Sequence, residues 1–111
     1  MKDDRVYLEH ILEAIQRIVT YTEGRRESFM NDSLVQDGVL RNLQTLAEST
    51  QRLSETLKSV HPEMDWRVIS GFRNILAHDY LCVDLERVWG VVGNRLPELK
   101  ISIGTMLKKT P

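Results

Sequence analysis

The spacing of apolar residues constrains this chain more than any other feature of its sequence. In the first quarter, apolar side chains recur at steps of three and four, and the same rhythm returns between residues 35 and 57. This spacing gathers apolar side chains on one face of a helix, whereas a strand would alternate apolar and polar residues. No segment shows sustained alternation, so the sequence predicts an all-α fold. The residues that carry the two patterns are Leu8, Ile11, Leu12, Ile15, Ile18 and Val19, then Val35, Val39, Leu43, Leu46, Thr50, Leu53 and Leu57.

Capping residues and prolines divide this pattern into separate helices. The expected helices begin near Asp4, at Asp32 or Ser33, after Asp65, after Asp84 and at Pro97. Gly24 should end the first helix, residues 25–32 should form a connector of about one turn, and the second helix should end near Lys58. No internal repeat or low-complexity linker interrupts the chain. We therefore expect residues 1–111 to form a single compact bundle of four to five helices.

Composition and charge limit the surroundings and partners of such a bundle. The 111 residues carry a formal net charge of -1, which argues against a generally basic surface that binds nucleic acid by counterion release. Cys82 is the only cysteine, so neither an intrachain disulfide nor a thiolate zinc cluster can form. The acidic start MKDDRVYLEH and the lack of any long apolar run predict a soluble, unprocessed, cytoplasmic protein without membrane contact. Because a short bundle often gains burial by self-association, dimerisation is open.

Polar chemistry is concentrated in the stretch RNILAHDY, residues 73–80, at the expected end of the third helix. On an ideal helix Arg73 and His78 lie about 140° apart, whereas Arg73 and Tyr80 lie within about 20°. One unbroken helix cannot easily aim all three together. Either the helix ends near His78 and the imidazole swings round, or two copies of the segment face each other across a symmetric dimer. Both arrangements would gather arginine and histidine into one pocket.

Such a pocket suits one reaction in particular. Histidine exchanges a proton near neutral pH, and arginine offers a forked donor that matches phosphate oxygens. Together they suit attack of an RNA 2′-hydroxyl on its own phosphate without a metal ion. Asn74, four residues before His78, could orient the imidazole or bind phosphate. From composition alone, however, a solvated arginine, a helix-ending histidine and a packed Tyr80 are the commoner arrangement.

The segment also resembles the Arg-x4-His-x-Tyr signature of the HepT-like toxins, which belong to the HEPN superfamily of α-helical ribonucleases. The resemblance covers nearly the whole chain in order, through HILEAIQRIVTYTEG, the 29–32 connector, VLRNL, PEMDW and LPEL. One departure is visible, because Ala47-Glu48-Ser49 stands where relatives commonly carry Gly-Glu-Ala. We expect close packing there to differ in detail, without an effect on Arg73 and His78.

The resemblance implies a role for each residue of the signature. Arg73 and His78 match the catalytic pair, Asn74 matches the polar residue after the arginine, and Tyr80 matches the tyrosine that a partner modifies. The implied protein is a metal-independent endoribonuclease toxin of a type II toxin–antitoxin system, with its pocket between two protomers and no cofactor. Its implied partners are RNA and a minimal nucleotidyltransferase antitoxin that adenylylates Tyr80, in a homodimer or a larger complex. The alternatives are a non-catalytic helical subunit that presents substrate to a nucleotidyltransferase, and a purely structural bundle.

Other candidate chemistry in the sequence is weak. Glu9, His10 and Glu13 could form half a metal site, but no second half is present, so we expect solvated side chains. Trp66 and Trp89 fall on helical positions and are expected to be packing residues rather than base-stacking platforms. The pairs Arg25–Arg26 and Lys108–Lys109 are most simply solvated charge, although Arg25–Arg26 could line an RNA path, and Glu48 is expected to be exposed.

Overall fold

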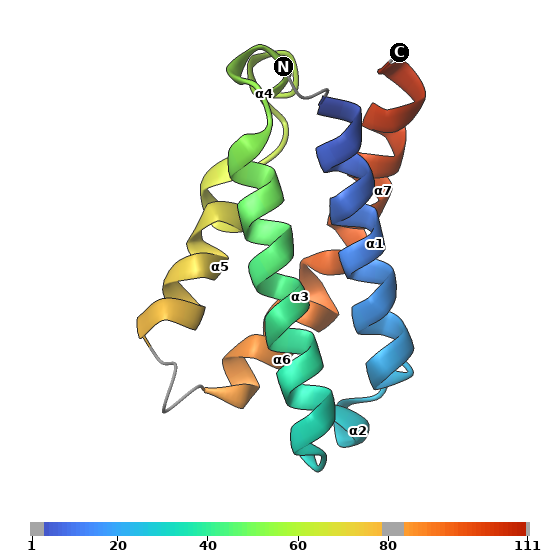
Figure 1. Cartoon of the computed structure of the whole chain (residues 1–111), viewed down its shortest axis with the longest axis vertical. Coiled ribbons are helices and arrows are strands. Elements are labelled where there is room, and N and C mark those ends of the chain that lie inside the picture. The colour runs from blue at the N-terminus through green and yellow to red at the C-terminus, as the bar shows by residue number, and fades with distance from the viewer. Residues whose placement is uncertain (1–3, 79–83, 111) are drawn as a thin grey trace.

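The computed structural model describes residues 4–78 and 84–110, without the side chains of residues 73–78. Every element in these residues is a helix, which confirms the predicted all-α fold (Figure 1). Five helices correspond to the predicted ones. Of two further helices of five residues each, α2 lies in the predicted connector and α4 lies where the second helix was expected to end. The elements are α1 (Asp4–Thr22), α2 (Arg26–Met30), α3 (Ser33–Arg52), α4 (Glu55–Ser59), α5 (Trp66–His78), α6 (Leu85–Asn94) and α7 (Leu96–Lys109).

The centre of the molecule is the pair formed by α1 and α3. Helix α5 packs against α3 on one side of this pair, and α7 packs against α1 on the other (Figure 1). The apolar stripes predicted from the sequence face each other here, and burying each large aliphatic side chain stabilises the fold by about 1.5–3 kcal/mol. The most deeply buried of these side chains, at 0–1% exposure, are Leu8, Ile11, Ile15, Ile18, Val39 and Leu46.

The predicted helix starts are confirmed by their capping bonds. The Asp32 carboxylate accepts from the Leu34 amide at 2.9 Å, and the Asp84 carboxylate accepts from the Arg87 amide at 3.2 Å. Pro97 occupies the first turn of α7, where a missing amide costs no helical hydrogen bond.

The end of α1 has a tight turn that explains the TYTEG stretch. Glu23 and Gly24 both adopt positive φ values, 54° and 70°. The buried Thr22 hydroxyl donates to the Ile18 carbonyl at 2.9 Å and accepts from the Gly24 amide at 3.2 Å. Gly24 therefore ends the first helix as predicted, because a left-handed backbone is cheapest at glycine.

The second predicted helix was wrong at its C-terminal end. It was expected to continue to about Lys58, but α3 ends at Arg52 and Leu53 is extended, with ψ 143°. Ser54 then caps α4 by accepting from the Leu57 amide at 3.1 Å. The Asp4 carboxylate at the start of α1 accepts from the Ser54 amide at 2.8 Å and from its hydroxyl at 2.6 Å. This bond across the bundle favours the break although the apolar repeat continues past it.

Candidate functional site

The proposed site residues lie at and beyond the end of α5. Arg73, Asn74 and His78 belong to the last two turns of that helix, but their side chains lie outside the described part of the structure. Tyr80 lies wholly outside the described residues. How the arginine and histidine are aimed, and whether two copies of the segment meet in a dimer, therefore remain predictions.

The described part of α5 shows how the helix that carries these residues is held. Asp65 caps its start by accepting from the Val68 amide at 3.2 Å. The Trp66 ring nitrogen donates to the carbonyl oxygens of Lys58, at 3.3 Å, and His61, at 3.2 Å, which ties α5 to α4 and the connector. Phe72, the residue before Arg73, is 3% exposed and packs into the core. The residues preceding the proposed catalytic pair are therefore firmly placed.

Helix α6, which follows residues 79–83, is held by a different part of the chain. The Trp89 ring stacks on Phe29 of α2, with centroids 5.7 Å apart and an interplanar angle of 24°. The side chain of Arg26 forms an ion pair with Glu86 across the same contact. Together with the bonds of Trp66, this confirms the prediction that both tryptophans are packing residues. Arg26 is exposed as expected, and its charge is matched by Glu86.

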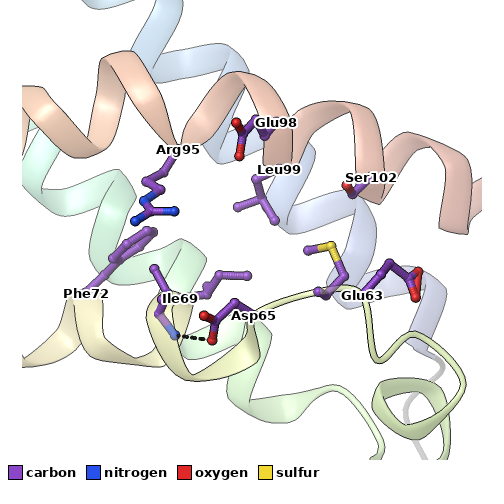
Figure 2. A pocket seen from close by; sticks show the side chains of 10 residues that line it. Glu63, Asp65, Ile69, Phe72, Arg95, Glu98, Leu99 and Ser102 are labelled. Atoms are coloured by element: carbon purple, nitrogen blue, oxygen red, sulfur yellow. Dashed lines mark hydrogen bonds between the residues drawn. The ribbon is translucent and has the colours of Figure 1, made fainter.

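A pocket of about 280 Å³ lies between the first half of α5 and the first half of α7 (Figure 2). Its apolar surface comes from both helices and from the connector before α5, and its charged groups come from that connector and from the start of α7. No pattern in the sequence predicts this pocket, since its residues belong to two segments some thirty positions apart and match no motif. The lining residues are Glu63, Met64, Asp65, Val68, Ile69, Phe72, Arg95, Glu98, Leu99 and Ser102.

The charged groups of this pocket are three carboxylates and one guanidinium. A hydrogen bond with its own backbone, together with the neighbouring His61 ring, lowers the pKa of the Glu63 carboxyl, which is therefore ionised at neutral pH. Asp65 is engaged in capping α5. Neither Arg95 nor Glu98, both exposed, forms an ion pair with another side chain in residues 4–72 or 84–110. Within those residues, no other side chain competes with a ligand for these two groups.

The weak metal-site candidate behaves as expected of solvated side chains. Glu9, His10 and Glu13 are all exposed, and the two glutamates pair with Arg5 and Arg17 on the surface of α1. Across the described residues, no three histidine, cysteine, aspartate or glutamate side chains are grouped so that they could hold a metal ion. Glu48 is also exposed, as predicted. Within the same residues, no helix has the length and apolarity that crossing a membrane requires.

Comparison with known proteins places the chain in a family. Residues 11–106 match the profile of the HepT-like family, described as "Ribonuclease HepT-like". A "Probable ribonuclease HepT" from Thermococcus cleftensis is 37% identical over 95 residues, which cover 85% of this chain and 86% of that protein. A "Putative RNase" from Caldanaerobacter subterraneus is 29% identical over 110 residues, covering 98% of both chains.

A third relative is a larger protein. A "Gamma-glutamylcyclotransferase and putative RNase" from Methanocaldococcus jannaschii is 34% identical over 103 residues, which cover 92% of this chain but only 46% of that relative. No solved structure gives a significant match. The family profile spans most of the chain, including α5 with Arg73 and His78, and the helical bundle agrees with it: the chain belongs to the HepT-like family of the HEPN superfamily.

Proposed function

We propose that this protein is a metal-independent endoribonuclease that acts as the toxin of a type II toxin–antitoxin pair. The observation that carries the proposal is the family match over residues 11–106, within which Arg73 and His78 stand at the spacing of the HepT-like signature. The names of the relatives, which describe RNases, support the same reaction class.

In the proposed reaction, an RNA 2′-hydroxyl attacks the adjacent phosphorus and the 5′-oxygen of the next nucleotide leaves. His78 exchanges the proton, as general base towards the 2′-hydroxyl or as general acid towards the leaving oxygen. Arg73 stabilises the negative charge that builds up on the phosphorane oxygens. Asn74 orients the imidazole or binds a phosphate oxygen. The products are a 2′,3′-cyclic phosphate end and a 5′-hydroxyl end.

We further propose that a second protomer completes the catalytic pocket around Arg73 and His78, which is distinct from the pocket between α5 and α7. Helix α5 packs against α3 along one side. Elsewhere on α5, a Cβ added at Gly71 would meet no described atom within 4 Å, so another chain has room to approach closely. A homodimer is expected at micromolar concentration by light scattering. A monomer that still cuts RNA at full rate would exclude the composite pocket.

The decisive experiment compares variants of one helix. Arg73→Ala and His78→Ala should each lower kcat/KM for RNA cleavage by a factor on the order of 10² or more, and the thermal unfolding of both variants should be unchanged. Arg67→Ala is the matched control, because Arg67 is an exposed arginine on the same helix and should leave the rate unchanged. Cleavage should persist in EDTA and leave the cyclic phosphate. Expression of the parent protein alone should slow the growth of the host cells, and either substitution should relieve this effect. If the purified protein cuts no RNA and both variants slow growth as strongly as the parent, the proposal fails.

The proposed regulation rests on Tyr80. A nucleotidyltransferase antitoxin would attach AMP to its hydroxyl, releasing pyrophosphate from ATP, and so place a bulky anion where an RNA phosphate should bind. Co-expression with a cognate nucleotidyltransferase should yield an adenylylated peptide containing Tyr80 and abolish cleavage. A neutralised complex with unmodified Tyr80 would instead show that the antitoxin occludes the site. The alternative is a non-catalytic subunit that presents substrate to the nucleotidyltransferase. It would be favoured if the protein cuts no RNA and its Arg73→Ala variant still binds the nucleotidyltransferase.

A further inference from the structure

One end of the pocket between α5 and α7 lies nearer to the proposed catalytic residues than the other. The two helices run in opposite senses along it, so Phe72 and Arg95 lie at one end and Glu63 and Ser102 at the other (Figure 2). Phe72 directly precedes Arg73, and His78 lies six helical steps beyond Phe72, a rise of about 9 Å. Arg95 therefore marks the end of the pocket that adjoins the proposed site, and the carboxylates lie farther from it.

The charges of the pocket do not suit the backbone of an RNA strand. With three carboxylates and one guanidinium, the lining carries a net charge of about -2 at neutral pH, which repels a row of phosphates. One nucleotide is a different case, because it combines a single phosphate with a base that is flat, partly apolar and edged with hydrogen-bond donors. Single-stranded RNA is commonly recognised in this way, by bases that leave the stack and enter protein pockets.

Each part of one nucleotide has a counterpart in the pocket. Arg95, which has no ion pair within residues 4–72 and 84–110, can pair with a phosphate at the end nearest the site. Met64 and Val68, the half-buried apolar residues of the lining, offer contact for the base, above a floor of buried Ile69, Phe72 and Leu99. Glu98 is the carboxylate left by the capping of α5 and by the pairing of Glu63. A volume of about 280 Å³ admits one base.

We propose that this pocket binds the base of the nucleotide next to the cleaved phosphate and selects for guanine. The N1–H and N2–H groups of guanine are two parallel donors that a carboxylate can accept together, as carboxylates accept from base amino groups elsewhere. Uracil is the worst fit, since two carbonyl oxygens flank its single N–H and would face the Glu98 carboxylate. The inference rests on the proposed ribonuclease function, to which it adds a base preference.

The test measures cleavage of short single-stranded RNAs that differ in one base beside a single cleavable bond. Wild-type protein should cut the guanine substrate at least about tenfold faster than the uracil substrate in kcat/KM, as one bidentate contact is worth about 1–3 kcal/mol. Glu98→Gln should reduce that ratio roughly tenfold, because it replaces an acceptor oxygen with an amide donor. Arg95→Ala should raise KM for both substrates and leave the ratio unchanged.

Glu27→Gln is the matched control for Glu98→Gln. Both glutamates are exposed and lie in the first turn of a helix, so both substitutions remove the same favourable charge from a helix N-terminus. The Glu27 variant should keep the wild-type ratio. Equal cleavage of both RNAs by the wild type, or a Glu98→Gln variant that keeps the preference, would overturn the inference and leave the ribonuclease function intact. Weaker assembly of Glu98→Gln with a nucleotidyltransferase, with unchanged base preference, would identify the pocket as a protein-docking site instead.

A binding experiment separates this inference from the reaction itself. Guanosine 5′-monophosphate should shift the backbone amide signals of Ile69 and Leu99 in NMR spectra of the unmodified protein, and uridine 5′-monophosphate should shift them much less. This result would support the pocket even if no RNA were cut, in which case the proposed reaction alone would fail. Absence of any shift with millimolar guanosine 5′-monophosphate would overturn the pocket assignment.

Discussion

Two helix interfaces in the molecule differ in the side chains that form them: the central one between α1 and α3, called the seam here, and the one between α5 and α7. Ile15 on α1 and Leu46 on α3 are at most 1% exposed and belong to the buried apolar cluster at the centre of the molecule. Where α5 faces α7, apolar residues share the surface with carboxylates and an arginine, around a pocket. The first region is thus a close-packed apolar core, and the proposed catalytic residues follow the second. Stability and chemistry can therefore be altered separately.

The largest expected effect that tests this contrast is the loss of a central side chain. Ile15→Ala should lower the free energy of unfolding by about 3–4 kcal/mol, because it removes apolar contacts and leaves a cavity. Ile69→Ala, beside the pocket, should cost about 2 kcal/mol, since solvent can reach the space. Ile101→Ala is the control, because its side chain is 72% exposed, and should cost less than about 0.5 kcal/mol. Urea unfolding measures all three.

The order of these three losses matters more than their size. If Ile69→Ala costs as much as Ile15→Ala, the pocket is filled in solution, and the contrast between the two regions disappears. Repeating the measurement at several protein concentrations would then show whether a second copy of the chain fills it.

A smaller effect is expected from the contact that ends α3. Asp4→Ala and Ser54→Ala should each cost about 1 kcal/mol, because each removes part of the bonding between the start of α1 and the cap of α4. The double variant should cost clearly less than the sum, since the two residues share one interaction. Strict additivity in the double-mutant cycle would show that the two residues act independently and that another contact sets the break after Arg52.

The smallest effect compares two glycines. Gly71→Ala on α5 should stabilise the chain by about 0.5–1 kcal/mol, because alanine favours the helix and its Cβ meets no described atom within 4 Å. Gly38→Ala on α3 should bring little or no gain, since its Cβ would lie 2.9 Å from the Tyr21 ring. Thermal unfolding resolves the difference. A destabilised Gly71→Ala dimer would show that a partner covers this face of α5, which would support the composite pocket.

Most of the fold could be predicted because its signals are local. Asp32, Asp84 and Pro97 mark helix starts through hydrogen bonds or backbone geometry within a few residues, and the apolar stripes identify the buried faces. The end of α3 could not be predicted in this way. Leu53 and Leu57 continue the apolar repeat, and the contact that favours the break comes from Asp4, fifty residues earlier. Nothing near Ser54 in the sequence points to that partner.

The candidate site also has a part that local sequence signals predict and a part that they do not. Arg73, Asn74, His78 and Tyr80 stand in one short stretch, so the sequence alone could identify them as candidates. The neighbouring pocket joins residues 63–72 with residues 95–102, and Glu98 stood out only as part of the stretch LPEL. Its position opposite α5 follows from how the helices pack, which no local pattern encodes.

The contact between α2 and α6 also bears on the order in which the chain folds during its synthesis. Phe29 and Trp89 are sixty positions apart, as are Arg26 and Glu86, so α6 cannot be held until more than three quarters of the chain has been made. Domains acquire their structure from the N-terminal side as the ribosome extends them. A nascent chain that ends within α5 can already bury the seam between α1 and α3, but the flank beyond residue 83 is still missing. The proposed catalytic segment at the end of α5 therefore gains its second flanking helix only late in synthesis.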